Sequence, residues 1–362
     1  MNKNIIVLPG DGIGPDVTRE AIKVVKTIGA KYGHNFVFEE YLIGGSALEQ
    51  CGTPLPRETW DACTKGEIIF LGAVGDPKWD NNPVELKPEQ GLKEIRIGLE
   101  LYANLRPVKL MAGLEDMSPL KNEIVSKGID IAIMRELTGG VYFGEKTISM
   151  TEKNGEKATD LMSYTTMEIE RIGRRAFELA ETRKRILTSV DKANVLECSR
   201  LWRKVMHKLA LEFPSVKYND LYVDNAAMQM IKAPHTFDVL VTENMFGDIL
   251  SDEASMLSGS LGLLPSASFS TSKVSLYEPV HGSAPDIAGK NLANPIAAIL
   301  SAAMMLRYSF NMEKEATDIE SSVEAVLREG IRTADLIGNM SAVGTSEMGD
   351  AICSYIKERG VG

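Results

Sequence analysis

Residues 241–252, VTENMFGDILSD, contain the change of pattern that indicates the fold class of this chain. A β-branched apolar run ends here, Gly247 interrupts it, and Asp248 and Asp252 follow four residues apart. If a helix begins near Gly247, both carboxylates lie on one face, where like charges repel by roughly 0.2–0.5 kcal/mol. A divalent cation bound by both would reverse this repulsion. The alternative is ordinary first-turn aspartate facing the positive end of the helix dipole.

The same change from strand pattern to helix pattern recurs along the chain. Short apolar or β-branched runs predict strands, and apolar residues at helical spacing predict helices. We expect strands at 5–8, 36–38, 67–72, 129–134, 141–150, 185–190, 217–223 and 237–241. We expect helices at 17–30, 90–103, 295–309, 313–329 and 347–358, a loop at 75–90, a crossing segment at 259–265 and a hairpin turn at Asn154-Gly155. The alternation predicts an α/β fold.

Length and composition limit the possible functions. A chain of 362 residues predicts roughly two domains of about 150 residues each. The net charge of −10 argues against nucleic acid and against an anionic membrane as partners. No apolar run approaches the roughly 18–20 residues of a membrane span. The cysteines are scattered without metal-type spacing, as in a cytoplasmic protein with reduced thiols.

Arginines stand in apolar or turn settings at Arg96, Arg106 and Arg135. Arg135 ends a predicted strand, and ligands of α/β sheets bind at strand ends. Converging guanidinium groups would hold a substrate with two carboxylates. Taken singly, each arginine is also compatible with an ordinary surface ion pair.

Lys192 and Asp224 also follow predicted strands, and Tyr142 lies in a glycine-containing turn. A Lys–Tyr pair can transfer protons when burial or neighbouring charges shift its pKa values. Asp224 is a third candidate metal carboxylate. Without such assistance, a lysine is an exposed charge and a tyrosine is a core residue.

Two glycine-containing segments are candidates for cofactor binding. Residues 10–14, GDGIG, lack the G-x-G-x-x-G spacing of a Rossmann site and favour a tight strand-to-helix turn. Residues 281–290, HGSAPDIAGK, are small enough for backbone amides to approach a phosphate, and Asp286 is placed to accept from a ribose diol. A plain Gly/Pro loop is the alternative.

Considered together, these segments resemble the isocitrate/isopropylmalate dehydrogenase family of β-decarboxylating dehydrogenases. The matching runs follow the family order and are 8–15, 104–107, 135–140, 191–195, 222–225, 246–252, 278–295 and 344–350. The resemblance implies a mixed twisted sheet flanked by helices, in two domains, without a true Rossmann fold. It implies a discontinuous cofactor domain, 1–102 plus 260–362, and a substrate, metal and dimerisation domain, 103–259, with an intersubunit arm near 145–165.

The resemblance also implies a reaction. We expect metal-dependent oxidative decarboxylation of (2R,3S)-3-isopropylmalate with NAD+, giving 4-methyl-2-oxopentanoate, CO2 and NADH in leucine biosynthesis. The alternatives are a related substrate, namely isocitrate, D-malate, tartrate or homoisocitrate, or a non-catalytic regulatory subunit. Leu92, one helical turn before Arg96, favours an isopropyl group. A regulatory subunit should have lost Lys192, Tyr142 or a metal aspartate, and this chain retains them.

The family roles transfer to this chain residue by residue. Arg96, Arg106 and Arg135 would bind the malate carboxylates, in a substrate pocket with Leu92, Glu89 and Asp224. Asp224, Asp248 and Asp252 would ligate Mg2+ or Mn2+, Lys192 would be the general base, and Tyr142 would be the acid. NAD+ would contact Ile13, Glu278, Gly282, Ser283, Ala284, Pro285, Asp286, Ile287 and Asn294. Lys192 and Asp224 would reach the active site of a second subunit, so we expect a homodimer with shared active sites.

Overall fold

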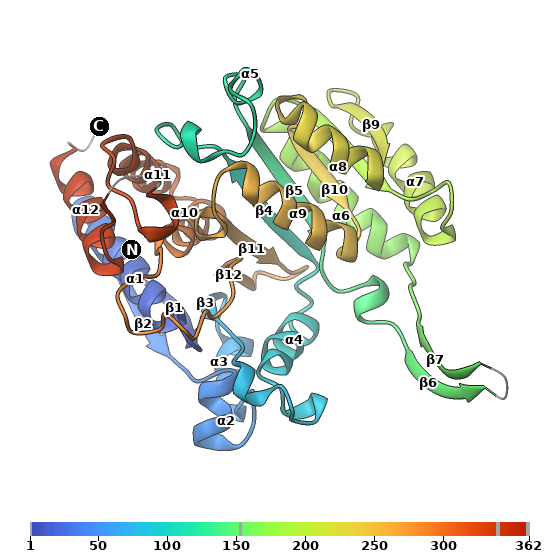
Figure 1. Cartoon of the computed structure of the whole chain (residues 1–362), viewed down its shortest axis with the longest axis horizontal. Coiled ribbons are helices and arrows are strands. Elements are labelled where there is room, and N and C mark those ends of the chain that lie inside the picture. Colours follow the sequence, from blue (N-terminus) through green and yellow to red (C-terminus); the bar gives the residue numbers. More distant parts are fainter. Residues whose placement is uncertain (1, 152–153, 338–340, 360–362) are drawn as a thin grey trace. The chain divides into compact units, whose positions relative to one another are not determined.

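The computed structural model describes residues 2–151, 154–337 and 341–359, in two compact units. Unit 1 comprises Met1–Leu101, Lys109–Asn122 and Ser255–Gly362, and unit 2 comprises Tyr102–Val108 and Glu123–Ala254. Strands and helices alternate along both units, as Figure 1 shows, which confirms the predicted α/β class.

The sheet of unit 1 is mixed. Its strands are β1 (Asn2–Gly10), β2 (Asn35–Glu40), β3 (Ile68–Ala73), β11 (Pro265–Phe269) and β12 (Ser275–Pro279). They lie in the order β2-β1-β3-β12-β11, with β1 parallel to β2 and β3, β12 parallel to β3, and β11 antiparallel to β12. Every residue of β3 is buried, as expected for a parallel strand covered on both faces.

The helices of unit 1 supply that cover. They are α1 (Gly14–Tyr32), α2 (Gly45–Cys51), α3 (Arg57–Lys65), α4 (Pro88–Gly98), α10 (Ile296–Phe310), α11 (Glu313–Arg328) and α12 (Thr345–Glu358). Residues Ile296–Leu306 of α10 are all buried, because this helix is apolar on every side and packs against α1, α11 and the strands β11 and β12.

The sheet of unit 2 follows the order β4-β5-β10-β8-β9. Its strands are β4 (Ala103–Lys109), β5 (Asp130–Glu136), β8 (Ile186–Asp191), β9 (Lys217–Tyr222) and β10 (Val239–Thr242). β10 is parallel to β5 and β8, and β8 is parallel to β9. Its helices are α5 (Asn122–Val125), α6 (Thr166–Glu181), α7 (Glu197–Ala210), α8 (Val223–Lys232) and α9 (Asn244–Leu257).

A two-stranded hairpin, β6 (Lys146–Thr151) and β7 (Gly155–Asp160), extends from the rest of unit 2 (Figure 1). The predicted turn at Asn154-Gly155 is confirmed for its described part, with Gly155 at φ +77°. The predicted strand 141–150 is wrong in its first part, because Gly140–Tyr142 forms a 3-10 turn. The strand begins only at Lys146.

Other boundaries differ from the sequence prediction. The predicted helix 90–103 is α4, which begins at Pro88 and ends at Gly98, and the chain reverses at Glu100 with φ +51°. A Cβ at Gly98 would lie 2.2 Å from the Trp60 ring, so only glycine fits there. The predicted loop 75–90 contains 3-10 turns at Pro77–Trp79 and Val84–Leu86. No helix within the described ranges has the length and apolarity to cross a membrane.

Candidate active site

Asp248 and Asp252, from residues 241–252, lie one turn apart on α9. The helix begins at Asn244, three residues earlier than predicted. Nη1 of Arg106 lies 3.6 Å from Asp248 Oδ1 and 3.5 Å from Asp252 Oδ1. Burial and the negative charge of Asp248 raise the pKa of Asp252, against the opposing effect of Arg106. The carboxylates of Asp248 and Asp252 thus lie on one face of α9, and both face the Arg106 guanidinium.

Arg106 is a buried residue of β4 whose guanidinium is fixed on two sides. Its Nε donates to Asn104 Oδ1 at 2.8 Å, and its Nη1 donates to Ser251 Oγ at 2.7 Å. Only 9% of its side chain is exposed. These two shortest hydrogen bonds are to neutral acceptors and fix the direction of the guanidinium, whose charge faces the carboxylates of Asp248 and Asp252.

Arg135, at the end of β5, approaches the same carboxylate. Its Nη1 donates to Asp248 Oδ1 at 2.5 Å, and only 5% of its side chain is exposed. A Cβ at Gly247 would lie 2.7 Å from Arg135 Cγ. Gly247 therefore lets the arginine lie across the first turn of α9.

Tyr142 completes the group around Asp248. Its hydroxyl donates to Asp248 Oδ2 at 3.1 Å. Burial and the charge of Asp248 raise the pKa of the phenol. The phenol therefore remains protonated at neutral pH, the state that a proton donor requires. Unit 2 thus brings Arg106, Arg135, Tyr142 and both α9 aspartates together.

Lys192 and Asp224 form a separate pair in unit 2. They follow the neighbouring parallel strands β8 and β9 and make a direct ion pair. The hydrogen bond from Lys192 lowers the pKa of Asp224. No three His, Cys, Asp or Glu side chains in the described ranges are grouped to hold a metal ion. Within one chain, Asp224 does not join Asp248 and Asp252.

Arg96, Leu92 and Glu89 lie on α4 in unit 1. Arg96 Nη2 donates to Glu278 Oε1 of β12 at 2.7 Å, while its buried Nε has no hydrogen-bond partner among the described residues. A buried guanidinium N–H without an acceptor fits a ligand carboxylate. Leu92 is partly buried against the core cluster that contains Ile95, and Glu89 is exposed.

The glycine-rich turn between β1 and α1 contacts the candidate cofactor loop. Ile13 N–H donates to the Ser283 carbonyl at 2.7 Å, and a Cβ at Gly12 would lie 2.0 Å from that oxygen. In a Rossmann site the corresponding glycine admits a pyrophosphate. Here Gly12 admits the backbone of the loop, so the turn supports the loop.

The rest of that loop leaves Gly282, Pro285 and Asp286 exposed, with Ala284 and Ile287 partly buried. His281 Nε2 is buried without a hydrogen-bond partner among the described residues, and burial lowers the pKa of this ring. Asn294 donates to Asp335 Oδ2 at 3.0 Å. The loop therefore combines small exposed residues, past which a ligand can approach the backbone, with the His281 Nε2 atom, and this combination is compatible with binding of a nucleotide.

Sequence reasoning missed two side chains that organise these segments. Asp11 accepts from the backbone N–H groups of Gly45, Ser46 and Gly75, each at 2.8 Å. Asn244 contacts Arg135 through its side-chain oxygen. Asp11 lies in the glycine-rich turn 10–14, and Asn244 lies in residues 241–252. The sequence around each residue does not distinguish it from an ordinary helix cap or turn residue.

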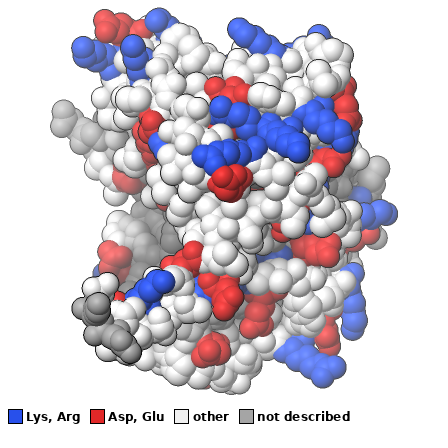
Figure 2. Space-filling view, turned by 90° about the vertical axis from the view of Figure 1, so that its right-hand side faces the viewer, with Lys and Arg blue, Asp and Glu red and all other residues white. Residues whose placement is uncertain are grey.

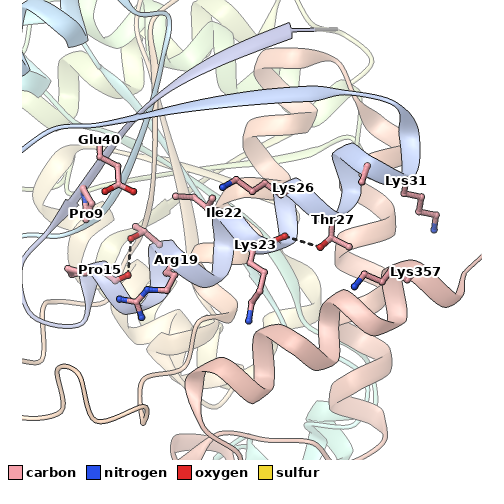
Figure 3. Close-up of a pocket in the computed structure, with 12 residues that line it drawn as sticks. Pro9, Pro15, Arg19, Ile22, Lys23, Lys26, Thr27, Lys31, Glu40 and Lys357 are labelled. Carbon is pink, nitrogen blue, oxygen red and sulfur yellow. Dashed lines mark hydrogen bonds between the residues drawn. The ribbon is translucent and has the colours of Figure 1, made fainter.

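A hollow of about 830 Å³ runs along α1 in unit 1, and Figure 3 shows its lining. Several lysines line it, but Lys23 pairs with Asp350 at 2.6 Å and Lys31 pairs with Asp318 at 2.6 Å. Much of its positive charge is therefore neutralised by these neighbours. Figure 2 shows a face on which several basic side chains form a band, with acidic side chains next to it.

Residues 4–352 match the model of a known family, described as isocitrate/isopropylmalate dehydrogenase. The chain belongs to the isocitrate/isopropylmalate dehydrogenase family. This confirms the resemblance on which the site residues were assigned. It also makes the chain a dehydrogenase by family, with a fold that is not of the Rossmann type.

Relatives and solved structures agree with this family. The chain is 59% identical over 352 residues to 3-isopropylmalate dehydrogenase of Geobacillus kaustophilus, covering 97% of this chain and 95% of that protein. It is 56% identical over 356 residues to the enzyme of the same name from Priestia megaterium, covering 98% and 96%. The crystal structure of isocitrate dehydrogenase from Methylococcus capsulatus matches with TM-score 0.86 at 35% identity, covering 98% of this chain and all of that chain.

Proposed function

We propose that this chain is a 3-isopropylmalate dehydrogenase that oxidises and decarboxylates (2R,3S)-3-isopropylmalate with NAD+. The observation that carries the proposal is the group on α9, where Arg106, Arg135 and Tyr142 surround Asp248. The names of relatives more than half identical to this chain support the choice of substrate. We further propose that it acts in leucine biosynthesis in the cytoplasm.

Asp248 and Asp252 would hold Mg2+ or Mn2+ together with Asp224 of a second copy. Their fit to a cation rests on two like charges one turn apart, both of which lie near the Arg106 guanidinium. When bound, the cation draws electron density from the substrate oxygens. Oxygen ligands of this kind suit both ions.

The side chains of this chain would then perform the proton transfers. Arg96, Arg106 and Arg135 bind and orient the carboxylates. Lys192 would take the proton of the C2 hydroxyl, and NAD+, when bound, would supply the acceptor for the C2 hydrogen as hydride. The C3–carboxylate bond would then break with loss of CO2, its electron pair would form the C2–C3 double bond of an enolate, and the Tyr142 hydroxyl would protonate that enolate at C3 to give the ketone.

NAD+ would lie on the loop from Gly282 to Ile287, with Ile13, Glu278 and Asn294 nearby. Ile13 and Ser283 are joined by a backbone hydrogen bond, so the turn and the loop would present one surface to the cofactor. Asp286 is exposed and would accept from the adenosine ribose. We assign the cofactor to unit 1, and the metal and dimer contacts to unit 2.

A homodimer would supply Lys192 and Asp224 to the α9 aspartates of the other copy. Unit 2 carries exposed apolar side chains on three elements, as a protein interface requires. They are Ile148 and Met150 on β6, Met228 and Ile231 on α8, and Ile249 on α9, each at least half exposed. We propose that a second copy covers these side chains and so brings Lys192 and Asp224 to the shared site.

A substrate panel tests this proposal directly. Purified protein with NAD+ and Mg2+ should form NADH with a kcat/KM for 3-isopropylmalate well above those for D-malate, tartrate, isocitrate and homoisocitrate. A preference for any of the other acids would replace the proposed substrate. No turnover of any acid would favour a regulatory subunit.

Leu92→Ala should lower kcat/KM for 3-isopropylmalate more than for D-malate. The lost methyl groups would face the isopropyl group, and a methylene-sized change in an apolar pocket is worth roughly 1–3 kcal/mol. Leu99→Ala is the matched control, because Leu99 packs against the same core cluster from the same segment. Steady-state kinetics with both acids measure the ratio, and equal losses for both acids would show that Leu92 does not touch the alkyl group.

Asp286→Lys should lower the preference for NAD+ over NADP+ by about a hundredfold. The carboxylate would accept from the ribose hydroxyls and repel a 2′-phosphate, and a few kcal/mol corresponds to this factor. Glu58→Lys, a charge reversal at another exposed position of unit 1, is the control. Lys290→Ala tests whether that lysine offsets the repulsion. An unchanged cofactor ratio in Asp286→Lys would mean that the residue does not read the ribose.

A further inference from the structure

We propose that Asn244 is a positioning residue that fixes both Arg135 and the turn carrying Tyr142 at the start of α9. The inference rests on the proposed function, because it concerns how two groups of that site keep their directions. Asn244 is completely buried and is the first residue of α9. It lies four residues before Asp248, the carboxylate that both groups contact.

The acceptor side of Asn244 holds the guanidinium. Arg135 Nη2 donates to Asn244 Oδ1 at 2.8 Å, and Nε donates to the same oxygen at 3.1 Å and to the Asn244 carbonyl at 3.0 Å. These contacts occupy one edge of the planar fork. They leave Nη1 directed at Asp248, where a substrate carboxylate would be met.

The donor side of Asn244 holds the Tyr142 turn. Nδ2 donates to the Gly139 carbonyl at 3.0 Å, and the 3-10 turn Gly140–Tyr142 follows at once. The backbone N–H of Asn244 donates to Tyr164 Oη at 2.9 Å, and a Cβ at Gly140 would lie 2.4 Å from that oxygen. The turn is therefore clamped between the Tyr164 ring and the Asn244 amide.

One amide thus couples two groups that come from different elements, Arg135 from β5 and Tyr142 from the following turn. Because Asn244 is buried, removing its amide costs the desolvation of the donors and the acceptor that it satisfied. Arg106 is held similarly, since its Nε donates to Asn104 Oδ1 at 2.8 Å. In both Arg106 and Arg135, therefore, the Nε–H group donates to the side-chain oxygen of an asparagine.

A double-mutant cycle separates this role from a purely structural one. Asn244→Ala, Arg135→Gln and the combined variant are compared in kcat/KM for 3-isopropylmalate. We expect Asn244→Ala alone to lose about tenfold to a hundredfold, the scale of one hydrogen bond to a charged group. In the Arg135→Gln background the same change should cost clearly less than in the wild type, because one of the two groups that Asn244 positions is gone while the contact to the Tyr142 turn remains. Losses that multiply would overturn the proposal.

Asn244→Asp tests the acceptor and donor contacts of the amide separately. Because Asp has the same shape as Asn, it also serves if the alanine variant fails to fold. A carboxylate still accepts from Arg135 but cannot donate to the Gly139 carbonyl. We expect KM to lie nearer the wild-type value than in Asn244→Ala, while kcat stays low. An Asp variant with the KM of the Ala variant contradicts the acceptor role.

Asn219→Ala is the matched control, because Asn219 Nδ2 donates to Thr188 Oγ1 and the residue lies on β9, which β8 and β10 separate from the strand of Arg135. It should change both parameters by less than about threefold. Inactivity of the wild-type protein on every acid would refute the proposed function. An active wild type with multiplying losses would refute only the role of Asn244.

Discussion

Asp248→Asn should lower kcat by at least about a hundredfold and raise the Mg2+ concentration needed for half-maximal activity. The Asp248 carboxylate accepts from Arg135 and Tyr142, lies near Arg106, and would bind the cation. Replacing it with the neutral amide of asparagine removes the negative charge from all of these contacts. A cation that polarises a substrate oxygen lowers the activation barrier by several kcal/mol. Mg2+ titrations of initial rates measure both effects.

Glu253→Gln is the matched control for Asp248→Asn. It removes a carboxylate charge on the same helix, at a residue whose pKa is raised by burial and that makes no ion pair with the described residues, and should leave kcat within about threefold of wild type. Removal of divalent ions by a chelator should abolish wild-type activity, and Mg2+ or Mn2+ should restore it. Full activity after exhaustive metal removal would contradict the metal role of α9.

Lys192→Met and Arg106→Ala should each be nearly inactive alone, yet a heterodimer of the two should regain one active site of two. Loss of a general base costs about 10²–10⁴-fold. If Lys192 serves the other subunit, one pocket of the heterodimer receives an intact Lys192 and an intact Arg106. Differently tagged chains, refolded together and purified as the heterodimer, allow the rate per site to be measured.

The control heterodimer combines Arg106→Ala with Asp248→Asn. Arg106 and Asp248 belong to the same pocket of one chain, so each of its two pockets carries one defect. It should remain inactive. If the Lys192→Met heterodimer is equally inactive, Lys192 acts within its own subunit and the shared site is wrong.

Much of the fold could be predicted where a strand or helix has its own local pattern. Residues 5–8 are continuously apolar and residues 296–306 are apolar except for Ser301, and the structure buries both segments, in β1 and α10. Strands β11 and β12 were not predicted, because segments such as Pro265–Phe269 contain small and polar residues without alternation. They are buried through tertiary packing, which local propensity does not record.

The site could be predicted as a set of residues but not as a geometry. Lys192 and Asp224 meet because β8 and β9 are parallel neighbours, with Asp191 opposite Tyr222. Which strands pair is decided by long-range packing, so the sequence could name both residues without joining them. Asn244 was missed for a similar reason, since its function lies in contacts to β5 and to residues 139–140.

The most direct test of the central claim is a product balance on the wild-type protein. Limiting (2R,3S)-3-isopropylmalate is incubated with excess NAD+ and Mg2+, and NADH, CO2 and 4-methyl-2-oxopentanoate are quantified. Oxidative decarboxylation predicts one equivalent of each per substrate consumed. NADH without CO2, or no consumption of this acid under conditions where another acid is turned over, would contradict the account.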